Sequence, residues 1–515
     1  MINNIVNKLT VKNLIKLFCL VILFTPIDTI FADSHSPVYG GKLKSALASE
    51  GIRGFETWKD TTATETHIYS VIYDSFIKYD DNYNIAPNLF ESWTTEDGIT
   101  WIFNIRKGVK WHDGQDLTSN NFIDYINTVL DPKSGATTET VDIYKGSEYL
   151  SLDKHTLKLV LPSANVALLD SFTAQWLSRT SDFKPSKPIG TGPYKLKKWN
   201  RNQSIVLVKN ENYWEKKLPY INELTFVMSP DESTRLNQLL MNEVDVIISV
   251  SLSEADKLKS NNEIKLIETP SQFTIMEYYM LMKNSISPFN NKIVRQAINH
   301  AIDREALLSV NFGLGELKSN PIPKGSWAFN PDAASYDIRN LAKAKKLMKE
   351  AGYDPKDAFS AKFSYWKEWP ENLQVAQILQ ANLADIGISV ELELLEVGQW
   401  VQTVLKDHKY EMALTALVPR WDPNDQFGNV YRTDDGAALE WQNAEFDKLW
   451  KSGRSSPDIN VRKPFYYKAQ EIAMDEVPAA ILNTIPKFDA SRSNVKNLIR
   501  FNRGDLYYQR AWIVK

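Results

Sequence analysis

The sequence predicts an α/β protein with two lobes, each containing a mixed sheet flanked by helices. The first observation is a strand, a helix and a second strand in succession over residues 204–250. The second is a set of amphipathic helices and alternating strands over residues 289–418. The third is that no repeat, low-complexity tract or flexible linker separates the two regions. A chain of 515 residues is long enough for two or three such lobes.

The N-terminus has the layout of a secretory signal peptide. Three lysines precede an apolar run over residues 17–24, which Pro26 ends. This run is too short to span a bilayer, which takes roughly 20 apolar residues. We expect residues 1–32 to be removed after Ala32; a permanent membrane anchor is the alternative, which Pro26 and Asp28 disfavour. The single cysteine, Cys19, leaves with this segment.

Composition excludes several classes of protein. The net charge of −3 and the absence of a basic stripe argue against a nucleic-acid partner. A cysteine-free mature chain must rely on its packed core rather than on disulfides. The six histidines are spread along the chain, none within four residues of another, so we expect no metal and no cofactor; they are at positions 35, 67, 112, 155, 300 and 408.

The common catalytic motifs are also missing. The sequence contains no HExxH, no GxSxG, no Walker A loop and no GxGxxG between a strand and a helix. We therefore expect that the protein is not an enzyme. An exported hydrolase acting on peptides or esters is the alternative, and a chaperone-like or adhesive protein is a third class.

In the first half of the chain, glycine-containing turns delimit the predicted strands. Alternating residues 43–47 predict the first strand. A strand over residues 101–105 and an extended piece over residues 109–114 predict a hairpin. We interpret His112, next to its second turn, as a hydrogen-bonding turn residue. Thr118 or Ser119 then caps a helix that Asp131-Pro132 ends.

The segment 204–250 predicts a parallel crossover unit. Strands over residues 204–208 and 224–228 are followed by a helix that Ser229-Pro230-Asp231 opens and by a buried strand in "VDVIISV". A strand, helix and strand this close together should have parallel strands and a right-handed connection.

The later part of the chain predicts a second sheet. Helices are expected over residues 289–302, over 340–352 with Gly352 after its end, and over 373–386. Alternation over residues 388–394 predicts a strand, and "YEMALTALV" predicts a strand near the centre of a sheet. We expect His300, on the first of these helices, at a boundary or on the surface.

Five segments carry a family likeness over nearly the whole mature chain: "IYDSFIKYDDNYNIAPNLFESWTTEDGITWIFNIRKGVKWHDGQDLTSNNFIDYINTVLDP", "PIGTGPYKLKKWNRNQSIVLVKNENYW", "DESTRLNQLLMNEVDVI", "FNNKIVRQAINHAIDRE" and "AKKLMKEAGY". In this order they resemble the family 5 extracytoplasmic solute-binding proteins, the dipeptide, oligopeptide, opine and nickel receptors of ABC importers. The resemblance implies a two-lobed, class II-like periplasmic binding protein of type C, with an extra inserted domain.

The resemblance also implies how the chain divides. It assigns residues 33–72, 190–282 and 487–515 to domain I, residues 73–189 to an inserted domain II, and residues 283–486 to domain III, the second lobe. "GTGPY", residues 190–194, would mark the return of the chain into domain I. Glycines there allow a close backbone approach, and the prolines stiffen it.

Family peptide receptors often place an aspartate a few residues before an Asp-Pro pair to receive the α-amino group of the ligand. Here the sequence reads "LVPRWDPNDQ", with no acid just before Asp422-Pro423, which weakens the assignment to peptides. Arg420 is suited to a carboxylate, and Trp421 to stacking. The candidate ligand-binding residues are Arg420, Trp421, Asp422, Asp425, Phe273, Tyr278, Tyr365, Trp366 and Lys367, with Tyr279 and Trp369 beside them.

Each of these residues also has a structural interpretation. Arg420 can be a surface residue, Asp422 and Asp425 can cap a turn, and the aromatic side chains can pack in a core. By resemblance, we expect a periplasmic, monomeric receptor that takes a small peptide, opine or amino-acid derivative between two lobes. Its partner would be the membrane permease of an ABC importer.

Overall fold

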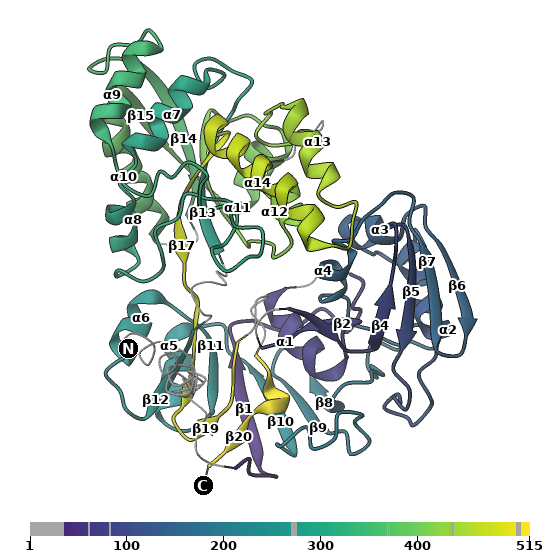
Figure 1. The fold of residues 1–515 in the computed structure, drawn as a ribbon. Helices are drawn as coiled ribbons and strands as arrows, with labels where there is room; N and C mark the ends of the chain where they lie inside the picture. The colour runs from purple at the N-terminus through teal and green to yellow at the C-terminus, as the bar shows by residue number, and fades with distance from the viewer. Residues whose placement is uncertain are drawn as a thin grey trace, which may run out of the picture. The chain divides into compact units, whose positions relative to one another are not determined.

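The computed structural model describes residues 36–59, 62–81, 84–268, 276–367, 369, 371–431, 433, 437–500 and 506–514. The helices and strands belong to the unit Val38–Lys515 (Figure 1). The expected signal peptide lies outside the described residues. None of the helices in these ranges has the length and the apolar character that crossing a membrane requires.

The largest sheet of the described chain has the strand order β12-β18-β11-β1-β10-β9-β8. Both β10 and β11 run parallel to β1, which lies between them, and α5 (Glu232–Leu240) connects them. The parallel strand–helix–strand unit that the sequence predicts, here β10, α5 and β11, is therefore confirmed; its right-handed connection stays a prediction. The strands are β1 (Lys42–Leu47), β8 (Tyr194–Asn200), β9 (Ser204–Lys209), β10 (Glu223–Met228), β11 (Val246–Val250), β12 (Ile264–Glu268) and β18 (Phe488–Arg492), with helices α1 (Ala63–Ile72) and α6 (Leu252–Leu258).

A second, antiparallel sheet has the order β4-β5-β7-β6. The hairpin predicted around residues 101–114 is wrong, because β5 pairs with β4 and β7, and residues 109–114 contain only a turn and an isolated bridge from Lys110 to Asp116. The helix predicted after Thr118 is confirmed. The elements are β4 (Phe90–Thr94), β5 (Thr100–Ile105), β6 (Glu148–Asp153), β7 (Thr156–Val160), α2 (Ser119–Leu130), α3 (Thr138–Tyr144), α4 (Leu168–Phe172) and the pair β2 (Ile77–Tyr79) and β3 (Ile85–Pro87).

A third sheet has the order β15-β14-β16-β13-β17, with α8 and α10 packed on its strands (Figure 1). The strand "MALTAL" lies at its centre, as predicted. The elements are β13 (Met276–Met282), β14 (Phe359–Trp366), β15 (Ile388–Leu395), β16 (Met412–Leu417), β17 (Ala479–Ile485), α7 (Lys292–Ala301), α8 (Arg304–Val310), α9 (Leu341–Glu350), α10 (Glu371–Ala384), α11 (Val397–Trp400), η2 (Val401–Lys406), α12 (Pro423–Val430), α13 (Ala444–Ser452) and α14 (Ile459–Glu476). Near the C-terminus, β19 (Val495–Lys496) pairs with β20 (Trp512–Ile513), and η3 (Tyr508–Arg510) precedes β20.

Two details of this region differ from the sequence interpretation. β13, which falls in the segment 190–282 that the resemblance assigned to domain I, pairs with β16 and β17 of the third sheet. His300, expected at a boundary or on the surface, is buried beside Tyr336, with ring centroids 4.6 Å apart. Burial places the pKa of His300 at about 4, so the ring is neutral at physiological pH.

The strands of the third sheet bring distant loops to one edge. β14, β15 and β16 run parallel, and β17 has the same direction because β13 is antiparallel to both β16 and β17. The carboxyl ends of these four strands and the start of β13 therefore share one edge, which we call the C-edge. Ligands of open α/β sheets bind outside the carboxyl ends of the strands.

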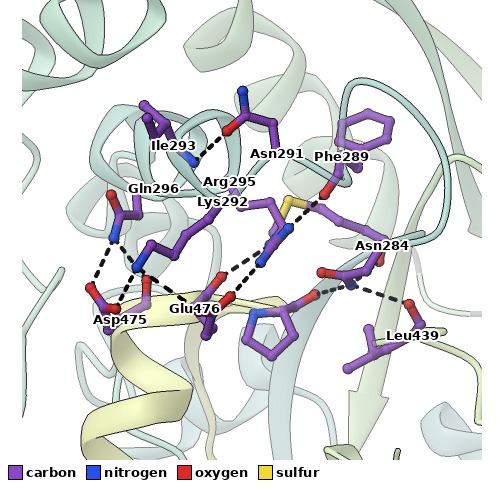
Figure 2. A network of polar contacts seen from close by, with 12 residues as sticks. Asn284, Phe289, Asn291, Lys292, Ile293, Arg295, Gln296, Leu439, Asp475 and Glu476 are labelled. Carbon is purple, nitrogen blue, oxygen red and sulfur yellow. Dashed lines mark hydrogen bonds and ion pairs between the residues drawn. The ribbon is translucent and has the colours of Figure 1, made fainter. Parts of the chain in front are cut away.

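A polar network secures the opposite edge of the same sheet (Figure 2). Asn291 caps α7 by accepting the Ile293 N–H at 2.9 Å. The Arg295 guanidinium, largely buried, donates to the Phe289 carbonyl at 2.8 Å and to the Glu476 carbonyl at 3.0 Å. These bonds attach α7 to the end of α14, just before β17 begins. They therefore stabilise the edge of the third sheet that lies opposite the C-edge.

The "GTGPY" corner is a close crossing of two backbone segments. The Gly192 N–H donates to the Ile72 carbonyl at 3.1 Å, and a Cβ at Gly192 would lie 2.6 Å from the Ile72 carbonyl carbon. His112 accepts the Gly190 N–H at 3.3 Å and contacts the Gly192 carbonyl at 3.1 Å, as expected for a turn residue. The Thr191 hydroxyl donates to Asp74 at 2.8 Å. The glycines are thus required by the close approach of the chain to the end of α1.

Candidate functional site

The C-edge brings together most of the candidate residues predicted from the sequence. Trp366 is the last residue of β14 and Lys367 follows it, residues 420–422 follow β16, and Tyr278 lies near the start of β13. These segments are far apart in the sequence and meet only because of the strand directions. Phe273 lies outside the described residues.

The aromatic candidates at this edge pack against one another. The ring of Trp366 lies 5.4 Å from that of Trp369 and 5.3 Å from that of Trp400. The Tyr278 hydroxyl donates to Asn372 at 2.7 Å, and Tyr278, Tyr365 and Trp366 are buried. Their observed contacts are those of a core, so a direct contact with a ligand stays a prediction for them.

Apolar and charged side chains are exposed at the strand ends and on the segments that follow them. Leu394, the last residue but one of β15, is 53% exposed, Val397 is 45% exposed, and Val418 is exposed after β16. Lys367 is exposed and forms an ion pair with Glu396. Single exposed apolar side chains are common on protein surfaces, so they mark a binding surface only where they adjoin other features of a site.

Asp422 has a structural role in the loop after β16. Its side chain caps α12 by accepting the Asn424 N–H at 2.9 Å, with Pro423 at the first helical position. Arg462 of α14 donates from one nitrogen to both Asp422 carboxylate oxygens at 2.8 Å. The capping interpretation of Asp422 is therefore confirmed, and Arg462 neutralises its charge.

A cavity of about 540 Å³ adjoins this loop. Trp421, Asp422, Trp327 and Arg462 form one wall, and residues of the second sheet and of α4 form the other. The remaining lining residues are Asn84, Ile85, Trp93, Thr94, Thr95, Trp101, Val166, Leu169, Asp170, Pro457 and Ile459. A cavity of this volume with aromatic walls and a few charged groups suits a small organic ligand.

Asp425, in the first turn of α12, is the candidate with the most altered acidity. Burial, followed by the nearby Asp170 and Asp422 carboxylates, raises its pKa to about 8, while Asn424 donates to it at 2.8 Å and Arg420 opposes the shift. Asp425 therefore holds its proton at neutral pH. A cation arriving beside Asp425 and Asp170 would favour release of that proton.

Arg462, Asp170 and Trp327 belong to this region but were not among the predicted residues. Arg462 lies in the first turn of the long helix α14, and its guanidinium lies 4.9 Å from the centre of the Trp327 ring. Asp170 is a buried acid on the short helix α4, where Tyr79 donates to it. The sequence around them carries no motif, so only the tertiary arrangement reveals them. In the described residues, no group of three or more His, Cys, Asp or Glu is arranged to hold a metal ion.

A cavity of about 630 Å³ at the opposite edge of the third sheet is the main competing location. Its ionisable side chains contact one another: Arg295 pairs with Glu476 at 3.1 Å, and His408 lies 3.2 Å from Glu440. Ser285 also donates to Glu440. These groups are engaged within the wall of the cavity. The C-edge is favoured as the functional site because the carboxyl ends of the parallel strands lie there.

The model of the bacterial extracellular solute-binding proteins, family 5, matches residues 84–438. The chain belongs to this family. It is 26% identical over 496 residues to the dipeptide-binding protein of Escherichia coli (strain K12), with 88% of this chain and 91% of that protein covered.

Solved structures show the same fold. The periplasmic binding protein DppA from Helicobacter pylori, in complex with the peptide STSA, matches with a TM-score of 0.74 at 24% identity, over 93% of this chain and 99% of that one. HbpA2 from Haemophilus parasuis matches with a TM-score of 0.82 at 21% identity, over 92% and 100%. This family 5 protein thus has the predicted two-lobed periplasmic-binding-protein fold, with mixed sheets flanked by helices.

Proposed function

We propose that this family 5 protein captures a small zwitterionic ligand, a peptide or an amino-acid derivative, at the C-edge. It then delivers the ligand unchanged to the membrane permease of an ABC importer. The observation that carries the proposal is the convergence of charged, aromatic and exposed apolar side chains on one edge, beside a cavity of about 540 Å³. The Escherichia coli relative is a dipeptide-binding protein, which supports this ligand class.

The two charges of the proposed ligand have separate partners. Arg420, with its planar fork of donors, would receive the carboxylate. Asp425 and Asp170 would receive the ammonium group, because Asp422 is already paired with Arg462. Trp421 lines the cavity between these groups and offers a flat apolar surface.

Ligand capture of this kind works by a shift between open and closed arrangements. A ligand favours the closed arrangement only to the extent that it binds that arrangement more tightly. We propose a periplasmic monomer divided as the resemblance implies, with domain III beginning before β13. The pairing of β13 in the third sheet supports that earlier boundary.

Titration of the purified mature protein with dipeptides and tetrapeptides tests the function. We expect saturable one-to-one binding by calorimetry and a change in tryptophan emission, and we expect mass spectrometry to recover each peptide intact. A hydrolysed product would instead support the hydrolase class. Binding of unfolded proteins without saturable peptide binding would support the chaperone-like class.

Arg420→Ala tests the proposed carboxylate contact. We expect affinity for a dipeptide to fall by about tenfold or more, since a charge-assisted hydrogen bond is lost, with little change in Tm. Calorimetry and thermal unfolding measure the two effects. Lys345→Ala, which removes one positive charge from the exposed face of α9, is the matched control and should bind normally. Unchanged affinity of Arg420→Ala would remove this residue from the site.

The raised pKa of Asp425 predicts that ligand binding is accompanied by the release of a proton. Because its pKa is about 8, Asp425 is mostly protonated at pH 7, and a ligand ammonium group would favour the carboxylate. We expect release of up to about one proton at pH 7. At pH 9.5 Asp425 has already lost its proton and the ligand amine is itself deprotonated, so binding of the ammonium form should be accompanied by proton uptake instead. Phosphate and Tris take up protons with different enthalpies. Calorimetry in both buffers therefore separates the heat of buffer protonation from the heat of binding. Asp425→Asn and an N-acetylated peptide should abolish the release; equal heats in both buffers would contradict the role of Asp425.

A further inference from the structure

A chain of buried polar groups runs beneath the loop that carries Arg420 and Trp421. It consists of Lys318, Glu277, Tyr279 and the side chain of Gln426, all of which are buried. Lys318 pairs with Glu277, and the Tyr279 hydroxyl donates to the other Glu277 oxygen at 2.5 Å. Gln426 donates to the Tyr279 oxygen at 3.2 Å. The chain thus connects a core ion pair to the first turns of α12.

Backbone groups determine the direction of every bond in this chain. The Arg420 N–H donates to Gln426 Oε1 at 2.6 Å, and Gln426 Nε2 donates to the Pro321 carbonyl at 3.0 Å. A backbone N–H cannot accept and a carbonyl cannot donate, so the Gln426 amide has one possible orientation. Its remaining N–H faces Tyr279, whose oxygen must accept. The Tyr279 proton must therefore go to Glu277.

We propose that Glu277 and Tyr279 are positioning residues for ligand binding, holding the Arg420 backbone in place through Gln426. The inference rests on the proposed function, since it concerns the loop that would contact the ligand. Gln426 anchors the loop at the Arg420 N–H, and Arg462 anchors it at Asp422. The two bonds hold the backbone at Arg420 and Trp421 in one conformation, and this conformation determines where their side chains can reach.

Stability alone does not account for such an arrangement. A buried ion pair often contributes no more to stability than apolar side chains of similar volume. A fully satisfied polar chain, in contrast, specifies one geometry, because each group accepts only the correct partner. Glu277 and Tyr279 stand on the same face of β13, two residues apart, directly behind the C-edge. Burying these polar groups costs free energy. That cost is explained if ligand binding requires the loop with Arg420 and Trp421 to keep one position.

Two nearly isosteric substitutions break the chain at different links. Tyr279→Phe removes the hydroxyl that accepts from Gln426. Glu277→Gln places an amide N–H against either Lys318 or Tyr279, both of which need an acceptor. Tyr336→Phe is the matched control, because it removes a buried hydroxyl of the same hydrophobic core, which donates to the Met474 carbonyl of α14 at 3.0 Å.

Hydrogen exchange without ligand reports the loop directly. In Tyr279→Phe and in Glu277→Gln, we expect amides of residues 418–426 to exchange about tenfold faster, equivalent to about 1.4 kcal/mol of lost protection. Calorimetry with the dipeptide Ala-Ala should show affinity reduced by a similar factor. The double variant should be no worse than either single variant, since both act through one chain. Tyr336→Phe should leave the exchange of this segment and the affinity unchanged.

The two measurements separate the possible failures. Wild-type exchange of residues 418–426 in Tyr279→Phe would overturn the inference, whatever the ligand. Faster exchange over the whole lobe, or equal effects in Tyr336→Phe, would also overturn it, because the role would then be general stability. If the wild-type protein binds no dipeptide or other peptide, the proposed ligand class fails, and the exchange data alone decide the positioning role.

Discussion

Gly192→Ala is expected to destabilise the protein strongly. A Cβ at this position would lie 2.6 Å from the Ile72 carbonyl carbon and 2.8 Å from the Tyr73 nitrogen, both backbone atoms that a rotamer change cannot move. Overpacking against a rigid neighbour costs about 1–3 kcal/mol or more, and the bond from the Gly192 N–H to Ile72 would be strained as well. We expect a cost near the upper end, visible as a fall in Tm and in the midpoint of chemical denaturation.

Gly398→Ala is the matched control for this prediction. An added Cβ at Gly398 meets no atom within 4 Å, and the residue lies in α11, where alanine is the better helix former. Its stability should equal or slightly exceed that of the wild type. Equal stability of Gly192→Ala and Gly398→Ala would mean that the crossing at Ile72 can open without cost, contrary to its close packing.

Arg462→Met is the second substitution with a large expected effect. Methionine keeps much of the length of the side chain but leaves the buried Asp422 carboxylate without its cation. Removal of one partner of a buried ion pair costs about 3–5 kcal/mol. The carbonyl of Gly453 also loses the Arg462 Nε donor at 2.7 Å. Thermal and urea unfolding should show the loss clearly.

A double variant distinguishes charge from packing in this result. Asp422→Asn keeps a side chain that can cap α12 and removes the unpaired charge. We expect Asp422→Asn/Arg462→Met to recover part of the stability lost in Arg462→Met. If the double variant is less stable than Arg462→Met by the full cost of Asp422→Asn, the two side chains act independently and the ion pair is not the cause.

Local structure was predictable from the sequence wherever capping and periodicity agreed. The α2 helix begins after Thr118 and ends before Asp131, as expected, and Gly352 follows α9 with a φ of +89°. The strand over residues 388–395 alternates between buried and exposed positions through its first half. These features depend on residues that are neighbours in the sequence, so short stretches of sequence are enough to predict them.

Strand pairing was less predictable, because it depends on residues far away in the chain. The turns around Gly108 and Gly114 were recognised correctly, yet β5 pairs with β7, about 55 residues further along, rather than with the segment after its own turn. Likewise, nothing local to β13 specifies that it pairs with β16 and β17 rather than with the strands that precede it. His300 is buried because Tyr336, from a distant loop, covers it.

The candidate site was predictable only in part for the same reason. The Asp-Pro pair identified the loop after β16, and the aromatic segment after β14 lies at the same edge. Arg462, Asp170 and the polar chain from Lys318 to Gln426 come from five separate elements or loops and have no sequence signature. Their roles follow from burial and hydrogen-bond direction, which the sequence does not display.

The position of β1 in the middle of the largest sheet has a consequence for biosynthesis. Its Lys42 is in register with Glu223 of β10, and β11, its other neighbour, pairs with β18, whose last residue is Arg492. β1 must therefore wait for partners made much later, and this sheet is completed only after β18 has been synthesised. Pairing between strands that are far apart in the sequence slows folding, and this sheet stays incomplete while the chain is being synthesised.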